Sequence, residues 1–226
     1  MRDYPQSFDA SDLGGLGVFL GGASAVLPLR EAAALPIASP SVVALRHDVD
    51  HDLDHAVRFA EWEAAQGYRS SYYVLPNSWY AADVGFAARL RYLEELGHEV
   101  GLHSNVVGLA YAESGDAFEA VDGSALPTGF LSRAAEIMRE QIAFLRSLGL
   151  DVSGTAAHGN GIEGASNLQL WAIGYSPQDF GLDYEAYHLH RDVLYLSDNR
   201  GRWSDPLRLD ETRQTHVLTH PEHWRL

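Results

Sequence analysis

Histidine and aspartate residues stand at the ends of several short apolar segments, and both residue types can bind metal ions or transfer protons. The first such segment, SVVALRHDVDHDLDHA (41–56), runs from apolar residues directly into carboxylates and imidazoles. The chemically capable groups at the segment ends are Asp48, Asp50, His103, His158, Asp198 and His220. The sequence contains no cysteine, so a metal site in it must be built from His, Asp or Glu.

Imidazole and carboxylate ligands around an open coordination position are typical of a catalytic zinc site. Imidazole ligands favour zinc or a similar transition metal over harder ions. Such a metal lowers the pKa of a water molecule and polarises a carbonyl oxygen. A nearby carboxylate can then accept the water's proton, and a histidine can protonate the leaving group. Asp48 and Asp50 are two residues apart, so on a regular strand they share a face, where one can bind metal while the other acts as base.

The elements that must position these groups repeat in the order helix, glycine, strand. We predict helices at 53–66, 82–96 and 132–148, each followed by a glycine, and a short helix at 168–175. The predicted strands are 42–47, 68–76, 98–103, 150–158, 192–198 and 215–220. This rhythm is typical of βα units on a parallel sheet or barrel, whose sites lie at the carboxyl ends of the strands. Residues 104–130 show little periodicity and are expected to form a long connection.

Length and charge limit the classes of protein and partner. The 226 residues suit a single domain spanning 1–226, with residues 1–40 as an N-terminal extension packed on it. A net charge of −15 argues against nucleic acid and against an anionic membrane as partners. No secretory signal or membrane span is visible, so we expect a cytoplasmic protein, and the oligomeric state stays open.

Each candidate residue also has a structural explanation. Asp48 and Asp50 could be ordinary loop residues. His103 and His220 could be histidines with a purely structural hydrogen bond. His158 precedes Gly-Asn and could be a turn residue. His51 is expected to be a solvated residue on the opening turn of a helix.

Four segments, LRHDVD (45–50), GHEVGLH (97–103), AAHGN (156–160) and VLTHPEHW (217–224), and a fifth, weaker one, YLSDNRGRW (195–203), are spread over roughly residues 41–226. In their order along the chain they resemble the polysaccharide deacetylases of carbohydrate esterase family 4. The nearest likeness is to the intracellular deacetylase-like proteins found with surface-polysaccharide genes. The resemblance implies an α/β fold, a distorted (β/α) barrel with about seven strands, and a carbohydrate substrate.

The same resemblance implies roles for single residues. Asp48 corresponds to the catalytic base and Asp50 to the metal-binding aspartate. His103 corresponds to the first histidine of the family's H-[ST]-x-x-H metal motif. His220 corresponds to the general acid, which Asp198 is expected to orient. The residues expected to contact substrate are Arg46, Asn105, Trp203 and Trp224, of which the two tryptophans would wall an acetyl or sugar pocket.

The sequence departs from the family's metal motif at Val107, where the family has its second histidine. Two residues could replace that ligand: His158, which ends another predicted strand, or Asn105 through its side-chain oxygen. We predict a divalent metal, with Zn²⁺ favoured, bound by Asp50, His103 and His158.

These predictions describe a metal-dependent hydrolase that removes an N-acetyl or similar acyl group from a sugar or polysaccharide precursor. Two other functions fit the same residues. One is a different C–N hydrolase, of the ureide or cyclic amide kind, because the RHDVD form of the first motif differs from the commoner T-F-D-D-G form. The other is a catalytically degenerate barrel that binds a glycan, because the second motif histidine is missing.

Overall fold

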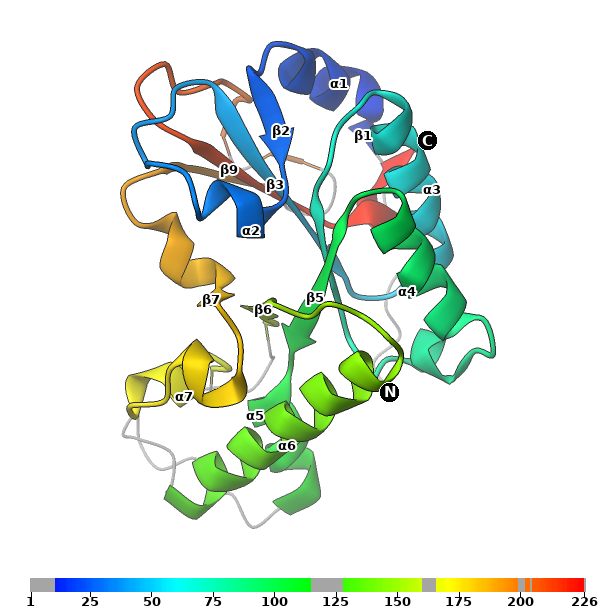
Figure 1. Cartoon of the computed structure of the whole chain (residues 1–226), viewed down its shortest axis with the longest axis vertical. Coiled ribbons are helices and arrows are strands. Elements are labelled where there is room, and N and C mark those ends of the chain that lie inside the picture. The colour runs from blue at the N-terminus through cyan, green and yellow to red at the C-terminus, as the bar shows by residue number, and fades with distance from the viewer. Residues whose placement is uncertain (1–10, 115–127, 160–165, 199–201, 204, 226) are drawn as a thin grey trace.

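A curled sheet of parallel strands forms the centre of the computed structural model, which describes residues 11–114, 128–159, 166–198, 202–203 and 205–225 (Figure 1). Its main strands are β3 (Val42–Val49), β4 (Ser71–Val74), β5 (Glu99–Ser104), β6 (Gly154–Ala157), β7 (Tyr184–Glu185), β8 (Leu194–Ser197) and β9 (Thr215–Thr219). Within the described residues they follow the spatial order β7-β6-β5-β4-β3-β9-β8, and every neighbouring pair is parallel. The α/β class and the distorted (β/α) barrel of about seven strands are confirmed, and the barrel is open between β7 and β8.

Helices cover the outer side of this sheet. The main ones are α3 (Leu53–Ala65), α4 (Phe86–Glu95), α5 (Val106–Ser114), α6 (Thr128–Ser147) and the short α7 (Gln169–Ala172). Figure 1 shows α3, α4 and α6 following one another along one side of the strands, and their apolar faces meet β4 and β5 in the largest core cluster. No helix among the described residues is both long and apolar enough to cross a membrane.

Helix ends follow the signals in the sequence. The Asp52 carboxylate accepts the backbone N–H of His55 at 2.8 Å and so caps the start of α3. Gly67, Gly97 and Gly149 follow the three long helices with φ of 77°, 93° and 89°, the left-handed region that favours glycine. Each helix therefore stops where the chain must turn back into the next strand.

The N-terminal residues pack against the sheet through two short helices and two short strands. These are β1 (Ser11–Asp12), α1 (Leu13–Gly21), β2 (Ala25–Leu27) and α2 (Leu29–Ala32). Strand β2 pairs with the first half of β3, and β1 pairs with β10 (Trp224–Arg225) near the other end of the chain. Leu16 and Leu20 of α1 share a core cluster with Phe59 and Trp224. Residues 1–10 lie outside the described residues, and the division into one domain stays a prediction.

The connection 104–130 differs from its prediction, because it contains α5 and the start of α6. Helix α5 follows β5 after a single residue, and Asn167 accepts the N–H of Val107 in its first turn at 2.8 Å. That cap comes from a residue 60 positions away, so local periodicity carries no sign of it. Residues 115–127 of the predicted connection lie outside the described residues.

A buried carboxylate behind β3 ties the strands together just before the candidate site. Glu63 of α3 accepts hydrogen bonds from His47 Nε2 and Ser70 Oγ, both at 2.7 Å, and from Tyr72 Oη at 2.8 Å. Burial alone would raise the pKa of Glu63, but the charge and hydrogen bond of His47 outweigh it and hold that pKa below its ordinary value. His47 Nδ1 lies 2.5 Å from Thr219 Oγ1, so the cluster joins α3, β3, β4 and β9.

Candidate metal and catalytic site

The strand order brings the predicted site residues to one edge of the sheet. Strand β3 lies in the middle, with β4, β5 and β6 on one side of it and β9 and β8 on the other. Asp48 and Asp50 come from the end of β3, His103 from β5, and His158 directly follows β6. The remaining pair, Asp198 and His220, directly follows β8 and β9. Since all these strands are parallel, their carboxyl ends place the groups around one site.

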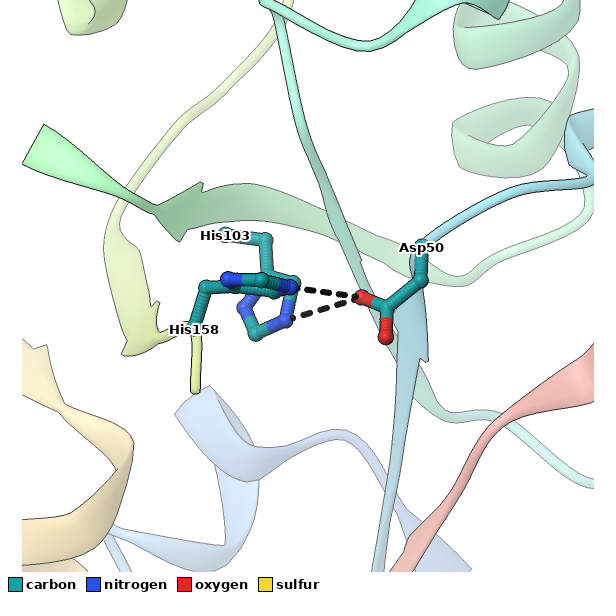
Figure 2. A group of neighbouring side chains, drawn as sticks. All are labelled: Asp50, His103 and His158. Atoms are coloured by element: carbon teal, nitrogen blue, oxygen red, sulfur yellow. Dashed lines mark ion pairs between the residues drawn. The ribbon is translucent and has the colours of Figure 1, made fainter. Parts of the chain in front are cut away.

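Asp50, His103 and His158 form a compact cluster (Figure 2). Asp50 Oδ1 lies 3.2 Å from His103 Nε2 and 3.7 Å from His158 Nε2. One ligand atom from each residue lies within 4.8 Å of the other two. Two imidazoles and one carboxylate at this spacing are a suitable ligand set for a divalent metal ion.

The hydrogen bonds around the cluster leave its inward atoms free to bind a cation. His103 Nδ1 donates to the backbone oxygen of Ala156 at 2.9 Å, so its Nε2 carries the lone pair in the neutral ring. Asp50 Oδ1 is buried and has no hydrogen-bond partner among the described residues. Acceptor atoms therefore face each other at this point, which is unfavourable unless a positive charge lies between them. The donor set fits a bound metal ion.

The two imidazoles have opposite shifts in pKa. Burial lowers the pKa of both, and for His158, which also lies beside His103, it falls to about 4. For His103, the charges of Asp48 and Asp50 outweigh burial and raise the pKa above its ordinary value. The cluster therefore favours one positive charge beside the carboxylates, which a proton or a divalent cation can supply.

Asp48 is held by an arginine from its own strand. Arg46 donates from Nε to Asp48 Oδ1 at 2.8 Å and from Nη2 to Oδ2 at 2.6 Å, and both side chains are buried. Burial raises the pKa of Asp48, but Arg46 and then His103 outweigh it, so the net pKa is lowered. Asp48 is therefore ionised at neutral pH, with Oδ2 at 3.5 Å from His103 Nε2. Arg46, which we predicted to contact substrate, is only 1% exposed, and its Nε and Nη2 bind Asp48. A contact with substrate stays a prediction.

His220 and Asp198 form a second hydrogen-bonded pair at the same edge. His220 Nδ1 lies 2.6 Å from Asp198 Oδ1, and the backbone N–H of His220 donates to Oδ2 at 2.9 Å. The indole of Trp224 donates to the same Oδ2 at 2.9 Å. The carboxylate thus orients the ring so that Nδ1 carries the proton in the neutral form and Nε2 can exchange a proton with a ligand.

The charges around His220 favour its protonated form. Burial lowers the pKa of His220, but the hydrogen bond and charge of Asp198, followed by the charges of Asp48 and Asp50, outweigh burial and raise it to about 9. At neutral pH the ring is therefore an imidazolium, the form that a general acid needs.

Replacing Asp198 should move the alkaline limb of the pH–rate profile. In Asp198→Asn, His220 loses its largest stabilising interaction, so its pKa falls toward or below the ordinary value of 6.5. Activity that needs the protonated ring should then decline at a lower pH than in the parent protein. The measurement is kcat/KM against pH for both proteins at equal metal content. An alkaline limb at the same pH in both would contradict the role of Asp198.

The other predicted substrate contacts have different surroundings. Trp224 is 2% exposed and lies in the core beneath Asp198, so its side chain does not form an open wall. Trp203 is partly buried and lies 5.1 Å from Trp224 between ring centroids. Asn105 Oδ1 accepts a hydrogen bond from Asn167 at 3.2 Å, and Asn167 also donates to the backbone oxygen of His158 at 2.6 Å. Asn105 thus supports the position of His158.

Sequence reasoning missed two residues beside Asp50. Glu222 lies in the short helix η5 (Pro221–His223), and His51 follows Asp50 in the chain. Ligand atoms of Asp50, His51 and Glu222 lie within 4.8 Å of one another. Burial, and then the charge of Asp50, raise the pKa of Glu222 to about 8. The only signal for Glu222 was its place between two histidines in THPEHW, and no spacing rule distinguishes it from a surface glutamate.

Among known proteins, the chain is similar to several solved structures. No protein-family model and no curated protein matches the chain. A chitin deacetylase from the fungal pathogen Colletotrichum lindemuthianum is 16% identical, with a TM-score of 0.45 over 84% of this chain and 80% of that one. A family 4 carbohydrate esterase from Bacillus anthracis is 11% identical, with a TM-score of 0.46 over 97% and 84%. A pseudoenzyme of the same esterase family from Bacillus anthracis is 14% identical, with a TM-score of 0.44 over 81% and 56%.

Proposed function

We propose that this chain is a metal-dependent hydrolase that removes an N-acetyl or similar acyl group from a sugar or polysaccharide precursor. One observation carries the proposal: three residues that could hold a metal ion, Asp50, His103 and His158, lie at the same sheet edge as an ionised carboxylate and a protonated histidine. A metal ligand set, a base and an acid are together what hydrolysis of an amide requires.

Each of the chain's own groups then has one task. Asp50, His103 and His158 would hold the ion, which when bound polarises the acyl carbonyl and lowers the pKa of water. Asp48, oriented by Arg46, would accept a proton from the attacking water. His220, oriented by Asp198, would donate a proton from Nε2 to the departing amine. The resulting amine and carboxylic acid account for all the atoms of the amide and the water.

The carbohydrate part of the proposal rests on the sequence motifs. A hydrolase of ureides or cyclic amides would use the same ligands, base and acid, because the bond broken is again C–N. A cytoplasmic location and a precursor as substrate also stay predictions. The two activities separate on a panel of N-acetylated sugars and ureides assayed at one enzyme concentration. Turnover of the acetylated sugars alone would support deacetylation, and turnover of ureides alone would overturn it.

Metal content provides the direct test of the proposed site. Protein purified without added metal is expected to hold about one zinc ion per chain, measured by elemental analysis. His158→Ala should lose that ion while keeping the far-ultraviolet circular dichroism spectrum of the parent. Metal-free parent protein that stays empty after equilibration with zinc would overturn the site and favour a glycan-binding barrel.

A further inference from the structure

Asp50 belongs to two groups of residues whose ligand atoms could hold a metal ion. One contains His103 and His158, and the other contains His51 and Glu222. The described residues contain no single set that joins all five within the same 4.8 Å limit, so the second group is considered apart from the first. The loop after β3 supplies Asp50 and His51, while η5, directly after β9, supplies Glu222.

The carboxylate of Asp50 can serve both positions. Its contacts with His103 and His158 both use Oδ1, on which the two dashed lines in Figure 2 converge. The other oxygen, Oδ2, takes part in neither of these two contacts. A carboxylate that offers one oxygen to each of two ions is a common bridge in sites whose metals lie about 3.5–4 Å apart.

Glu222 supplies an unpartnered group at the second position. Its Oε2 is buried and has no hydrogen-bond partner among the described residues. The same carboxyl group lies beside the carboxylate of Asp50. Two carboxylates at this distance repel each other unless a cation or a shared proton lies between them.

From this geometry we propose that Asp50, His51 and Glu222 bind a second divalent cation, and that Asp50 bridges it to the ion held by His103 and His158. The proposal rests on the proposed function for the first ion. Two carboxylates and one imidazole form a harder ligand set than two imidazoles and one carboxylate, so the second position suits Zn²⁺ or Mn²⁺. It should bind more weakly than the first, because it offers fewer imidazoles.

A third group of possible metal ligands in the described residues differs from the other two, because its carboxylate already has hydrogen-bond donors. Asp198, His220 and His223 also place ligand atoms within 4.8 Å of one another. However, Asp198 already accepts hydrogen bonds from the backbone and ring of His220 and from the indole of Trp224. A carboxylate with that many donors is satisfied without a metal ion, whereas Glu222 Oε2 and Asp50 Oδ1 are not.

A zinc titration of chelator-treated protein tests the proposal, with bound metal counted by elemental analysis after removal of free ion. The parent should bind two ions per chain, one tightly and one more weakly. Glu222→Gln should keep the tight ion and lose the weak one. His51→Ala should give the same result, and it replaces the glutamine variant if that protein folds poorly. The matched control is Glu211→Gln, since Glu211 is exposed and belongs to none of the clusters. It should bind two ions.

Manganese gives a second measurement that does not depend on activity. Two Mn²⁺ ions bridged by one carboxylate couple magnetically, so the paramagnetic resonance spectrum of the loaded parent should differ from that of an isolated ion. Glu222→Gln should give the isolated-ion spectrum. If the parent binds one ion and Glu222→Gln matches it, a proton occupies the second position and the proposal is wrong. If the parent binds none, the proposed function fails as well.

Discussion

Asp50→Ala should bind no zinc and should hydrolyse its amide substrate no faster than metal-free parent protein. Asp50 belongs to both groups of candidate metal ligands, and its Oδ1 lies closest to His103 and His158 in the first. Loss of a group that only orients a ligand already weakens metal binding by roughly 10–100-fold, and loss of a charged ligand should cost more. The measurements are elemental analysis for zinc and an assay of acid release from an N-acetylated sugar.

Asp54→Ala is the matched control for this experiment. Asp54 is an exposed carboxylate on α3 that pairs with Arg89 and belongs to no candidate metal cluster. It should keep the zinc content and activity of the parent. Asp50→Ala protein that retains stoichiometric zinc would place the metal elsewhere, and retained turnover without zinc would remove the metal from the reaction.

Asp48→Asn should bind zinc normally but lower kcat by roughly 10²–10⁴-fold, the usual range for a general base. The amide cannot take a proton from water, whereas Asp48 is ionised because Arg46 outweighs the effect of its burial on the pKa. Asp48 belongs to no candidate metal cluster, so zinc content should separate this variant from Asp50→Ala. The measurement is kcat at saturating substrate, together with elemental analysis.

Folding must be followed in the same Asp48→Asn sample. The change leaves the buried guanidinium of Arg46 without its anionic partner, which typically costs about 3–5 kcal/mol of stability. Thermal unfolding should therefore begin at a lower temperature than in the parent, and the assay belongs well below that temperature. Folded, zinc-loaded Asp48→Asn with parental kcat would show that Asp48 is not the base.

Much of the architecture could be read from local patterns. The apolar run that ends in Asp48, the helix that Asp52 caps and Gly67 follows, and the strand that ends in His103 all follow from side-chain periodicity and backbone preference. Parallel βα units send their carboxyl ends to one edge, so the residues at those ends could be grouped before the strand order was known. Helix α5 was missed, because part of its first turn is capped by the distant Asn167.

The roles of several side chains depended on neighbours that are remote in sequence. The sequence predicts Arg46 as a substrate contact, whereas the buried strand also makes it the hydrogen-bond partner of Asp48, and this second role depends on the fold. Trp224 was expected to wall a pocket on the strength of the family resemblance, whereas it packs with α1 in the core and donates to Asp198.

The sequence by itself determined which chemistry the chain can offer: carboxylates and imidazoles at strand ends, no thiolate, and elements that alternate as a parallel barrel requires. Only the tertiary structure decided which of these groups meet. The order of the strands places His158 beside His103, and the turn after β9 brings Glu222 to Asp50. Local propensities act over a few residues, whereas these contacts join segments more than 50 residues apart, and packing of the whole sheet sets them.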